Sequence, residues 1–296
     1  MDKIFQNIQI NINQQGTIHD FFSAYPHVLE NEEYGWMKYE KFAYVKYPVY
    51  NFDHVNSEEL NRIFKKTNAP VLSYSILNPD GNVYWYVCRN ITLQNLKATQ
   101  RRDISKAAND LVIKDISIDT IIKYGFEAFS DTRKRVGLSD FNRKDFSNRF
   151  SKQKHTNANY YVGAFQGEQL QAFVSLIIFN NKVEIEGIFS RNAALPLCVN
   201  NYLNFAVTYY FLNIRKMDLV SYGFSSIQEG DFEGLHRFKL KCGFDAIPVQ
   251  RIFVVNPKYK IFINSITLQL AKSIIQIFPK NRLARKLKGV ISILSN

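Results

Sequence analysis

Several features that define other protein classes are scarce or absent in this chain of 296 residues. Its three cysteines, Cys88, Cys198 and Cys242, lie far apart and form no Cys-x-x-Cys pair or Cys/His cluster. This spacing argues against a disulfide framework or a zinc site, and we expect no metal. Three free thiols fit a reducing cytosol. The chain also has no run of about 18 apolar residues and no signal-peptide pattern at its start, so we expect a cytoplasmic protein without a transmembrane helix.

Acidic residues are missing from the C-terminal part of the chain. All 26 lie at or before Asp245, so the segment from Ala246 onward carries +9 of the net charge of +12. Within that segment, apolar residues recur every four positions, as in an amphipathic helix. They are Phe262, Ile266, Leu270, Ile274 and Phe278, followed after Pro279 by Leu283, Leu287, Ile291 and Leu294. We expect residues 257–296 to form a basic helical tail that lies on an anionic membrane; alternatively, its first stripe packs on the body.

The remaining chain has the composition and patterning of a folded α+β protein. Hydrophobic residues make up 46% of the chain, with 24 Phe and 17 Tyr, which indicates a large aromatic core. Ser57 is a candidate N-cap for a helix, and the runs 71–77 and 83–88 predict a β-hairpin across the turn residues 78–82. Further along, the pattern predicts helices over 118–136 and 143–153, strands over 160–166, 171–179 and 182–189, and a long helix over 197–216.

Two motifs identify a family. Residues 219–255 read as a strand, a small turn, a short helix and a returning strand, with Gly243 suited to a helix C-terminus. Residues 96–108 contain the pair Arg101–Arg102 followed by Ile104 and Ala107. In their order along the chain, with residues 96–108 first, the two motifs resemble those of the Fem-type branch of the GNAT acyltransferases. Proteins of this branch carry two GNAT folds in tandem. The resemblance covers roughly residues 72–255.

The resemblance implies a fold and a division of the chain. We expect an α+β protein with two GNAT-like halves, residues 1–109 and 110–256, joined by the helix that holds Arg101 and Arg102, and followed by the tail. The two halves show no sequence repeat of their own, so the duplication rests on the resemblance alone.

The resemblance also implies site residues near the end of the strand at 219–222. Tyr222 would protonate a leaving group or hold an acceptor, and Lys239 would contact a phosphate or an oxyanion. The residues implied to bind substrate are Ser225, Ser226, His236, Arg101 and Arg102. For each of them an ordinary structural role stays open: a core tyrosine, a serine-rich turn, or a solvated basic side chain.

Two further candidate site residues lie in the strand at 182–189 and in the loop that follows it in the sequence. Glu184 and Glu186 alternate and so share one face of the strand; we select Glu186 as a catalytic base, although both would equally suit a solvent-facing side. Arg191 would contact a phosphate or remain solvated. The loop 190–196 occupies the place where simple GNATs hold the pyrophosphate of coenzyme A, yet it contains no glycine and includes Pro196, which lacks an N–H group.

These features lead to one functional expectation and two alternatives. We expect an acyl- or aminoacyltransferase that acts on an amine or hydroxyl of a bacterial cell-envelope glycan or its lipid-linked precursor. The donor would be acyl-CoA or aminoacyl-tRNA, the enzyme would lie at the inner face of the plasma membrane, and DNA would not be a partner. The alternatives are an acetyl-CoA-dependent N-acetyltransferase of a soluble sugar or amine, and a non-catalytic GNAT-like scaffold that binds membrane.

Overall fold

The structure is a computed structural model that describes residues 2–23, 25, 27–39, 43–138, 141–153, 157–225, 232–260, 269 and 273. Ser226 lies outside the described residues. The predicted tail also lies outside them from residue 261 onward, apart from two single positions. The amphipathic helix expected there therefore stays a prediction.

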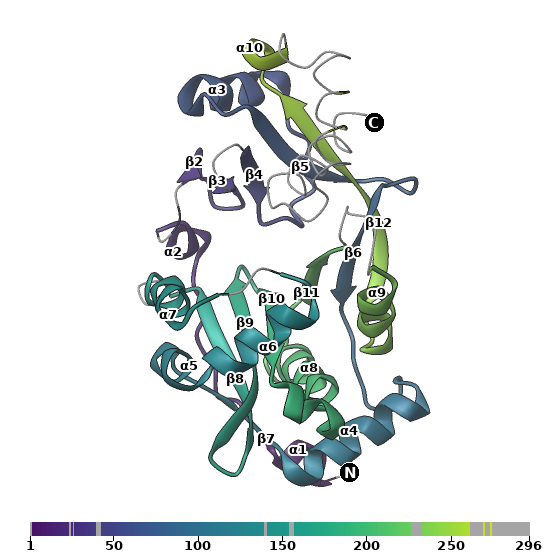
Figure 1. Cartoon of the computed structure of the whole chain (residues 1–296). Coiled ribbons are helices and arrows are strands. Elements are labelled where there is room, and N and C mark those ends of the chain that lie inside the picture. Colours follow the sequence, from purple (N-terminus) through teal and green to yellow (C-terminus); the bar gives the residue numbers. More distant parts are fainter. Residues whose placement is uncertain are drawn as a thin grey trace.

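The described chain contains both strands and helices throughout its length (Figure 1). The strands are β1 (Ile8–Gln9), β2 (His27–Val28), β3 (Gly35–Tyr39), β4 (Ala43–Tyr47), β5 (Val71–Leu77), β6 (Val83–Cys88), β7 (Val112–Asp115), β8 (Asn159–Gln166), β9 (Gln169–Phe179), β10 (Lys182–Ser190), β11 (Leu219–Phe224) and β12 (Asp245–Val255). The helices are α1 (Asp2–Gln6), α2 (Ile18–Phe22), α3 (Ser57–Thr67), α4 (Ala98–Asp110), α5 (Ile118–Tyr124), α6 (Phe126–Arg135), α7 (Arg143–Ser151), the 3₁₀ helix η1 (Asn192–Leu197), α8 (Val199–Tyr209), the π-helical turn η2 (Tyr210–Ile214), α9 (Phe232–Lys241) and α10 (Pro257–Lys260).

All of these strands belong to one mixed sheet in the order β1-β7-β8-β9-β10-β11-β6-β12-β5-β4-β3-β2. The α+β class predicted from the sequence is confirmed. The sheet is continuous across the boundary expected after residue 109, because β6 lies between β11 and β12, and β1 pairs with β7. The division at residues 109 and 256 stays a prediction.

The predicted hairpin of β5 and β6 is wrong in its pairing, although both strands have the predicted bounds. The long strand β12 lies between them: its first half pairs with β6 and its second half with β5. Val249 is the crossing point, since it pairs with both Leu77 and Val83. The turn that connects β5 to β6 passes over this point, where a Cβ atom on Gly81 would lie 2.3 Å from the carbonyl carbon of Val249. Close backbone approach therefore explains this glycine.

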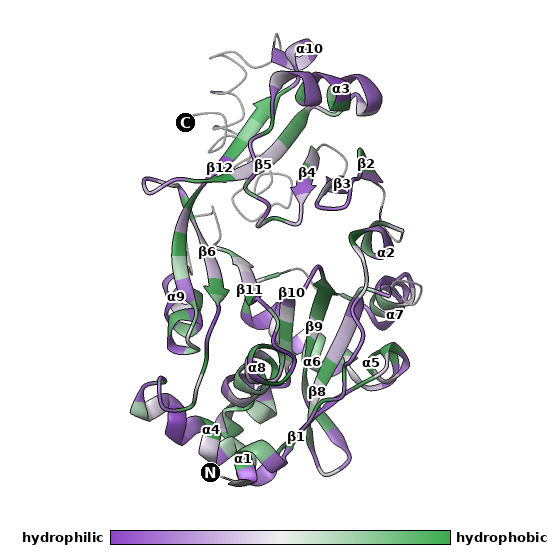
Figure 2. Cartoon of the chain, turned by 180° about the vertical axis from the view of Figure 1, so that it is seen from behind, coloured by the Kyte–Doolittle hydropathy of each residue, from purple (hydrophilic) through white to green (hydrophobic). Residues whose placement is uncertain are grey.

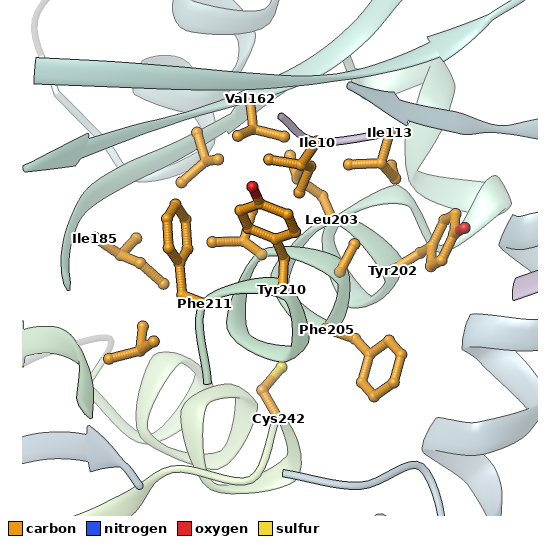
Figure 3. Packing of buried hydrophobic residues seen from close by; sticks show 14 of the residues in the cluster. Ile10, Ile113, Val162, Ile185, Tyr202, Leu203, Phe205, Tyr210, Phe211 and Cys242 are labelled. Carbon is orange, nitrogen blue, oxygen red and sulfur yellow. The ribbon is translucent and has the colours of Figure 1, made fainter. Parts of the chain in front are cut away.

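Two apolar layers cover the sheet on its two faces. On one face, α4, α8 and η2 pack against β7 to β10; Leu203 and Tyr210 point toward Ile113 and Val162 of the sheet (Figure 3). On the other face, phenylalanine side chains of α6 and α7 pack against Phe173 of β9. The strands β8 to β10 are thus packed on both faces, so β10 has a well-supported position in the sheet.

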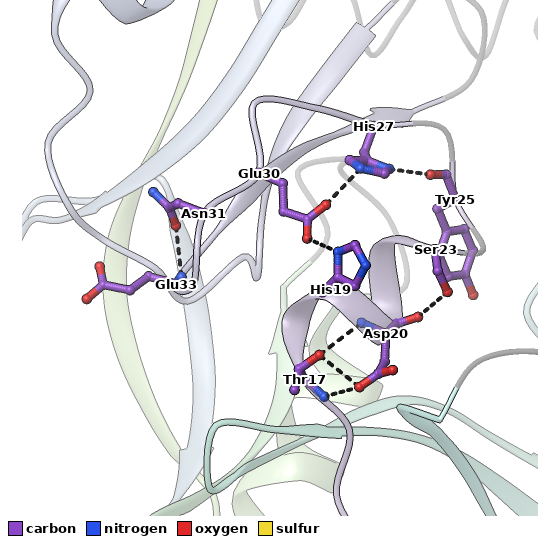
Figure 4. Close-up of polar contacts among 9 residues, drawn as sticks. All are labelled: Thr17, His19, Asp20, Ser23, Tyr25, His27, Glu30, Asn31 and Glu33. Atoms are coloured by element: carbon purple, nitrogen blue, oxygen red, sulfur yellow. Dashed lines mark hydrogen bonds and ion pairs between the residues drawn. The ribbon is translucent and has the colours of Figure 1, made fainter.

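Helix α2 packs between the end of β4 and the strand β9. It begins at a capping box in which Thr17 and Asp20 satisfy each other's backbone N–H groups (Figure 4). The buried rings of Phe21 and Phe22 then pack around Tyr47, which stacks on Phe21 at 4.5 Å between ring centroids. Tyr47 at the end of β4 is thereby held against β9 and β10.

The outer parts of the molecule are polar. In Figure 2 helix α3 is largely hydrophilic, whereas β5 and β12 carry many hydrophobic residues. Helix α3 begins with Asn56 as its N-cap rather than Ser57, because the Asn56 side chain accepts a hydrogen bond from the backbone N–H of Glu59. None of the helices in the described ranges combines the length and the apolar character needed to cross a bilayer.

Candidate functional site

The parallel strands β10 and β11 pair over only three residues and then separate. Residues 182–184 of β10 pair with 219–221 of β11, after which β10 continues along β9 and β11 along β6. Each strand has a bulge just beyond this point, between Ile185 and Gly187 in β10 and between Ser221 and Phe224 in β11. Gly223, with a φ of +61°, supplies the backbone conformation that the second bulge requires. The side chains that flank the separating strands form the candidate site.

Glu184 is the last residue of β10 that pairs with β11, and its side chain is buried. Its Oε2 accepts a hydrogen bond of 3.3 Å from the hydroxyl of Tyr47. Burial, reinforced by the charge of Glu186, raises the pKa of Glu184 to about 8. At neutral pH this carboxyl therefore holds its proton for most of the time.

Glu186 is the extra residue of the β10 bulge, and solvent reaches it. Its Oε2 accepts a hydrogen bond of 2.8 Å from the hydroxyl of Ser175 on β9. Although part of the residue is exposed, the protein atoms around its carboxyl group raise the pKa of Glu186, while the Ser175 hydrogen bond and the charge of Arg149 lower it. A carboxylate that is oriented by a hydrogen bond and more basic than usual is suited to accept a proton.

Lys239 of α9 lies on the β11 side of the separation, and its ammonium group is buried. Its Nζ donates to the carbonyl oxygens of Tyr222 at 2.7 Å and Phe224 at 3.4 Å, which are the residues of the bulge. The Nζ also lies 4.2 Å from the ring centroid of Tyr86. Burial lowers the pKa of Lys239 to about 7, and the charge of Glu184 acts against this shift. The structure therefore gives Lys239 two contacts with protein carbonyls; its contact with a phosphate or oxyanion stays a prediction.

Tyr222 and Ser225 lie at the same end of β11. The ring of Tyr222 packs edge-on against Phe244 with 5.6 Å between centroids, and burial raises its pKa. The hydroxyl of Ser225 accepts a hydrogen bond from the backbone N–H of Tyr84, and the N–H of Ser225 donates to the carbonyl of the same residue. Ser225 thus extends the pairing of β11 with β6, and the predicted catalytic role of Tyr222 stays a prediction.

The other predicted substrate-binding residues have partners in different parts of the fold. His236 Nδ1 lies 2.7 Å from the hydroxyl of Tyr86, on the side of α9 that faces β6. Arg101 donates to the carbonyl of Leu96 at the start of α4, and Arg102 lies 3.9 Å from a carboxylate oxygen of its neighbour on α4. The structure brings neither arginine into contact with the residues of the β10–β11 separation.

Arg191 follows β10 directly and forms an ion pair of 2.8 Å with Glu127 of α6. Among the residues that the structure describes, no three acidic, histidine or cysteine side chains converge as they would around a metal ion.

Two residues of the candidate site, Glu184 and Tyr47, could not be assigned to it from the sequence alone. Glu184 was recognisable as one of two alternating glutamates in an apolar strand, but nothing indicated that it was the buried one. Tyr47 lies 137 positions earlier in the chain than Glu184, and only its packing under α2 brings it to β10.

Comparison with known proteins supports the fold. No protein-family model matches the sequence, and no curated protein matches it. The solved structure of FemX superimposes with a TM-score of 0.59 at 9% identity, over 88% of this chain and 97% of that one. The C-terminal domain of a putative lysylphosphatidylglycerol synthetase from Agrobacterium fabrum gives 0.53 at 12% identity, over 93% and 96%. L-PGS from Bacillus licheniformis gives 0.51 at 10% identity, over 84% and 90%. The chain therefore has the Fem-type, GNAT-like acyltransferase fold.

Proposed function

We propose that this protein is an acyl- or aminoacyltransferase that acylates an amine or hydroxyl of a cell-envelope glycan or a lipid-linked precursor. The observation that carries the proposal is the position of Glu186, an exposed residue with a raised carboxyl pKa that lies in the bulge where β10 and β11 separate. The comparisons add a chemical direction. The name lysylphosphatidylglycerol describes an amino acid joined to a lipid, and the resemblance to Fem-type proteins points to aminoacyl transfer in envelope synthesis.

Glu186 is the general base in this proposal. It takes the proton from the attacking amine or hydroxyl as the new bond to the donor's carbonyl carbon forms and the ester or thioester bond breaks. The hydrogen bond from Ser175 holds the carboxylate in one orientation, leaving its other lone pairs for the acceptor. The departing oxygen or sulfur must gain a proton, and Tyr222 is the candidate donor.

Lys239 places an ammonium group beside β11 in its protonated form, and with a pKa lowered to about 7 it carries this charge in about half of the molecules at neutral pH. Its ammonium group lies where the Tyr222 and Phe224 carbonyls of the bulge are turned toward α9. A cation held in a site with little water stabilises negative charge that develops nearby on the reacting carbonyl oxygen. The same hydrogen bonds hold the backbone of β11 in its bulged form.

The proposed location is the cytoplasmic face of the plasma membrane, reached through the basic segment 257–296. Its cations would attract anionic lipids, and its apolar stripe would enter the interface. Such an attachment places the enzyme beside an acceptor that cannot leave the bilayer.

A panel of labelled donors and acceptors tests the function. Labelled aminoacyl-tRNA and labelled acetyl-CoA are each incubated with lipid-linked glycan precursors, phosphatidylglycerol vesicles and soluble amino sugars, and transfer of label is measured. We expect transfer from aminoacyl-tRNA to a glycan or lipid acceptor, and a loss of about 100-fold or more in Glu186→Gln. The matched control is Glu168→Gln, in the exposed turn between β8 and β9. Transfer only to soluble amines, or equal rates in wild type and Glu186→Gln, would contradict the proposal.

A further inference from the structure

The turn between β10 and η1 occupies the place where simple GNATs hold the pyrophosphate of coenzyme A. Binding there requires backbone N–H groups that point at the ligand and have no other acceptor, together with a following helix N-terminus.

The first three N–H groups of the turn already donate to the protein itself. Ser190 N donates to the hydroxyl of Thr132 at 2.8 Å, and Arg191 N to the carbonyl of Gln171 at 2.9 Å. Asn192 N donates to a carboxylate oxygen of Asp131 at 2.7 Å. The N–H donors at the start of the turn, from residue 190 to residue 192, are therefore engaged.

Helix α6 provides most of these acceptors, and it surrounds the turn with charge. Glu127, Asp131 and Arg135 are spaced four residues apart and so lie on one face of α6. Arg135 donates to the Ser190 carbonyl at 3.0 Å and to the Ser190 hydroxyl at 2.8 Å, while Glu127 holds Arg191. The side chains of α6 thus hold the turn from several directions, and two of them are acidic.

The helix dipole is also displaced from the turn. The α-helix that follows, α8, begins at Val199, after the 3₁₀ helix that contains Pro196. Cys198 separates the two helices with a φ of +58°. The N-terminal end of α8 is therefore separated from the end of β10 by residues 191–198.

We infer that the Asp131 carboxylate occupies, as an internal anion, the place of the pyrophosphate, so that coenzyme A is not bound at this turn. The residues present do not fit coenzyme A in the manner of simple GNATs. The Asp131 carboxylate already takes the N–H of Asn192, and the N–H groups of residues 190–192 have no free capacity. This inference rests on the proposed function in one respect: it restricts the acyl donor of the transferase to an ester, such as aminoacyl-tRNA, that binds the protein at a place other than this turn.

Amide hydrogen exchange of the full chain tests this inference without an activity assay. Exchange of the peptides that cover 187–198 is measured by mass spectrometry with and without 1 mM coenzyme A, at a concentration chosen as about that of weak binding. We expect no change in these peptides. Slower exchange across the turn in the presence of coenzyme A would overturn the inference.

Variants at Asp131 show whether the carboxylate holds the turn. Asp131→Ala is expected to speed exchange at Asn192 about tenfold, because one hydrogen bond is lost. Asp131→Asn keeps an oxygen acceptor and is expected to leave the exchange near that of the wild type. If Asp131→Ala does not fold, the comparison of wild type with Asp131→Asn still applies, and protection of either by coenzyme A contradicts the inference.

The outcome can be separated from that of the proposed function. Protection of the turn by coenzyme A would overturn this inference while leaving transfer through Glu186 intact. Absence of protection together with no transfer from any donor would overturn the proposed function while leaving the assignment of the turn in place.

Discussion

Replacement of Glu184 by glutamine is expected to stabilise the protein at neutral pH. The carboxyl is buried, and its pKa is raised to about 8 from an ordinary value of 4.5. Glutamine has nearly the same shape as the protonated acid, and its side-chain oxygen can accept the hydrogen bond from Tyr47. The variant therefore resembles the form of Glu184 that the folded protein prefers.

The size of the effect follows from proton binding. Between pH 4.5 and 8 the unfolded chain has released this proton while the folded protein still holds it. Because the folded state binds more protons in that window, the contribution of Glu184 to the free energy of unfolding is fully present below pH 4.5. This contribution is lost as the pH rises toward 8. The loss is about 1.4 kcal/mol per pH unit, which amounts to about 3 kcal/mol at pH 7. Glu184→Gln has no proton to lose and should avoid this loss.

Urea unfolding followed by tryptophan fluorescence at pH 5, 6 and 7 measures the difference. The range stops at pH 7 because Lys239, whose pKa is lowered to about 7, adds stability with rising pH above that value. The free energy of unfolding of Glu184→Gln should exceed that of the wild type by an amount that grows from pH 5 to pH 7. Glu168→Gln is the exposed control and should show no such trend. A constant difference across the range, or a variant less stable than wild type at pH 7, would refute the reasoning.

Three further predictions concern α9, the crossing of β12 and the tail. Lys239→Met and Tyr222→Phe should each lower transfer while circular dichroism shows a retained fold; full activity in both variants would contradict the site. Gly81→Ala should destabilise the protein by about 2 kcal/mol or more in urea unfolding, because its Cβ meets the backbone of Val249; a neutral effect would mean that the turn moves freely. The full chain should co-sediment with anionic vesicles, weaken in high salt and lose binding when truncated after Pro279, whereas equal binding by the truncated chain would assign the tail a structural role.

Local patterns in the sequence predicted the elements well. The apolar runs gave β5 and β6 their bounds, and Asn180 and Asn181 adopt the positive φ values expected of a tight turn between β9 and β10. Where two good capping residues stand side by side, the pattern cannot choose between them, and the N-cap of α3 is Asn56 rather than Ser57. The long helix expected over 197–216 contains the helices α8 and η2, with a change to π-helical geometry at Tyr210.

Pairing and site geometry were harder to predict, because both depend on residues far apart in the chain. The strand β12 lies between β5 and β6 although its sequence is separated from theirs by more than 150 positions. The contact of Tyr47 with Glu184 has no local signal, and the engagement of the 190–192 amides depends on where α6 packs. The alternation of Glu184 and Glu186 did indicate a pair of carboxylates on β10, and their different burial emerged only from the fold.

The pH dependence of a single turnover tests the central claim most directly. With a donor and acceptor identified from the panel, the rate of transfer is measured from pH 4.5 to pH 8 for the wild type and Glu186→Gln. The account predicts that the wild-type rate falls tenfold per pH unit below a midpoint above 4.5, because protonated Glu186 cannot act as a base, and that the slow residual rate of Glu186→Gln lacks this midpoint. The same midpoint in both proteins, or a wild-type rate independent of pH over this range, would contradict Glu186 as the base.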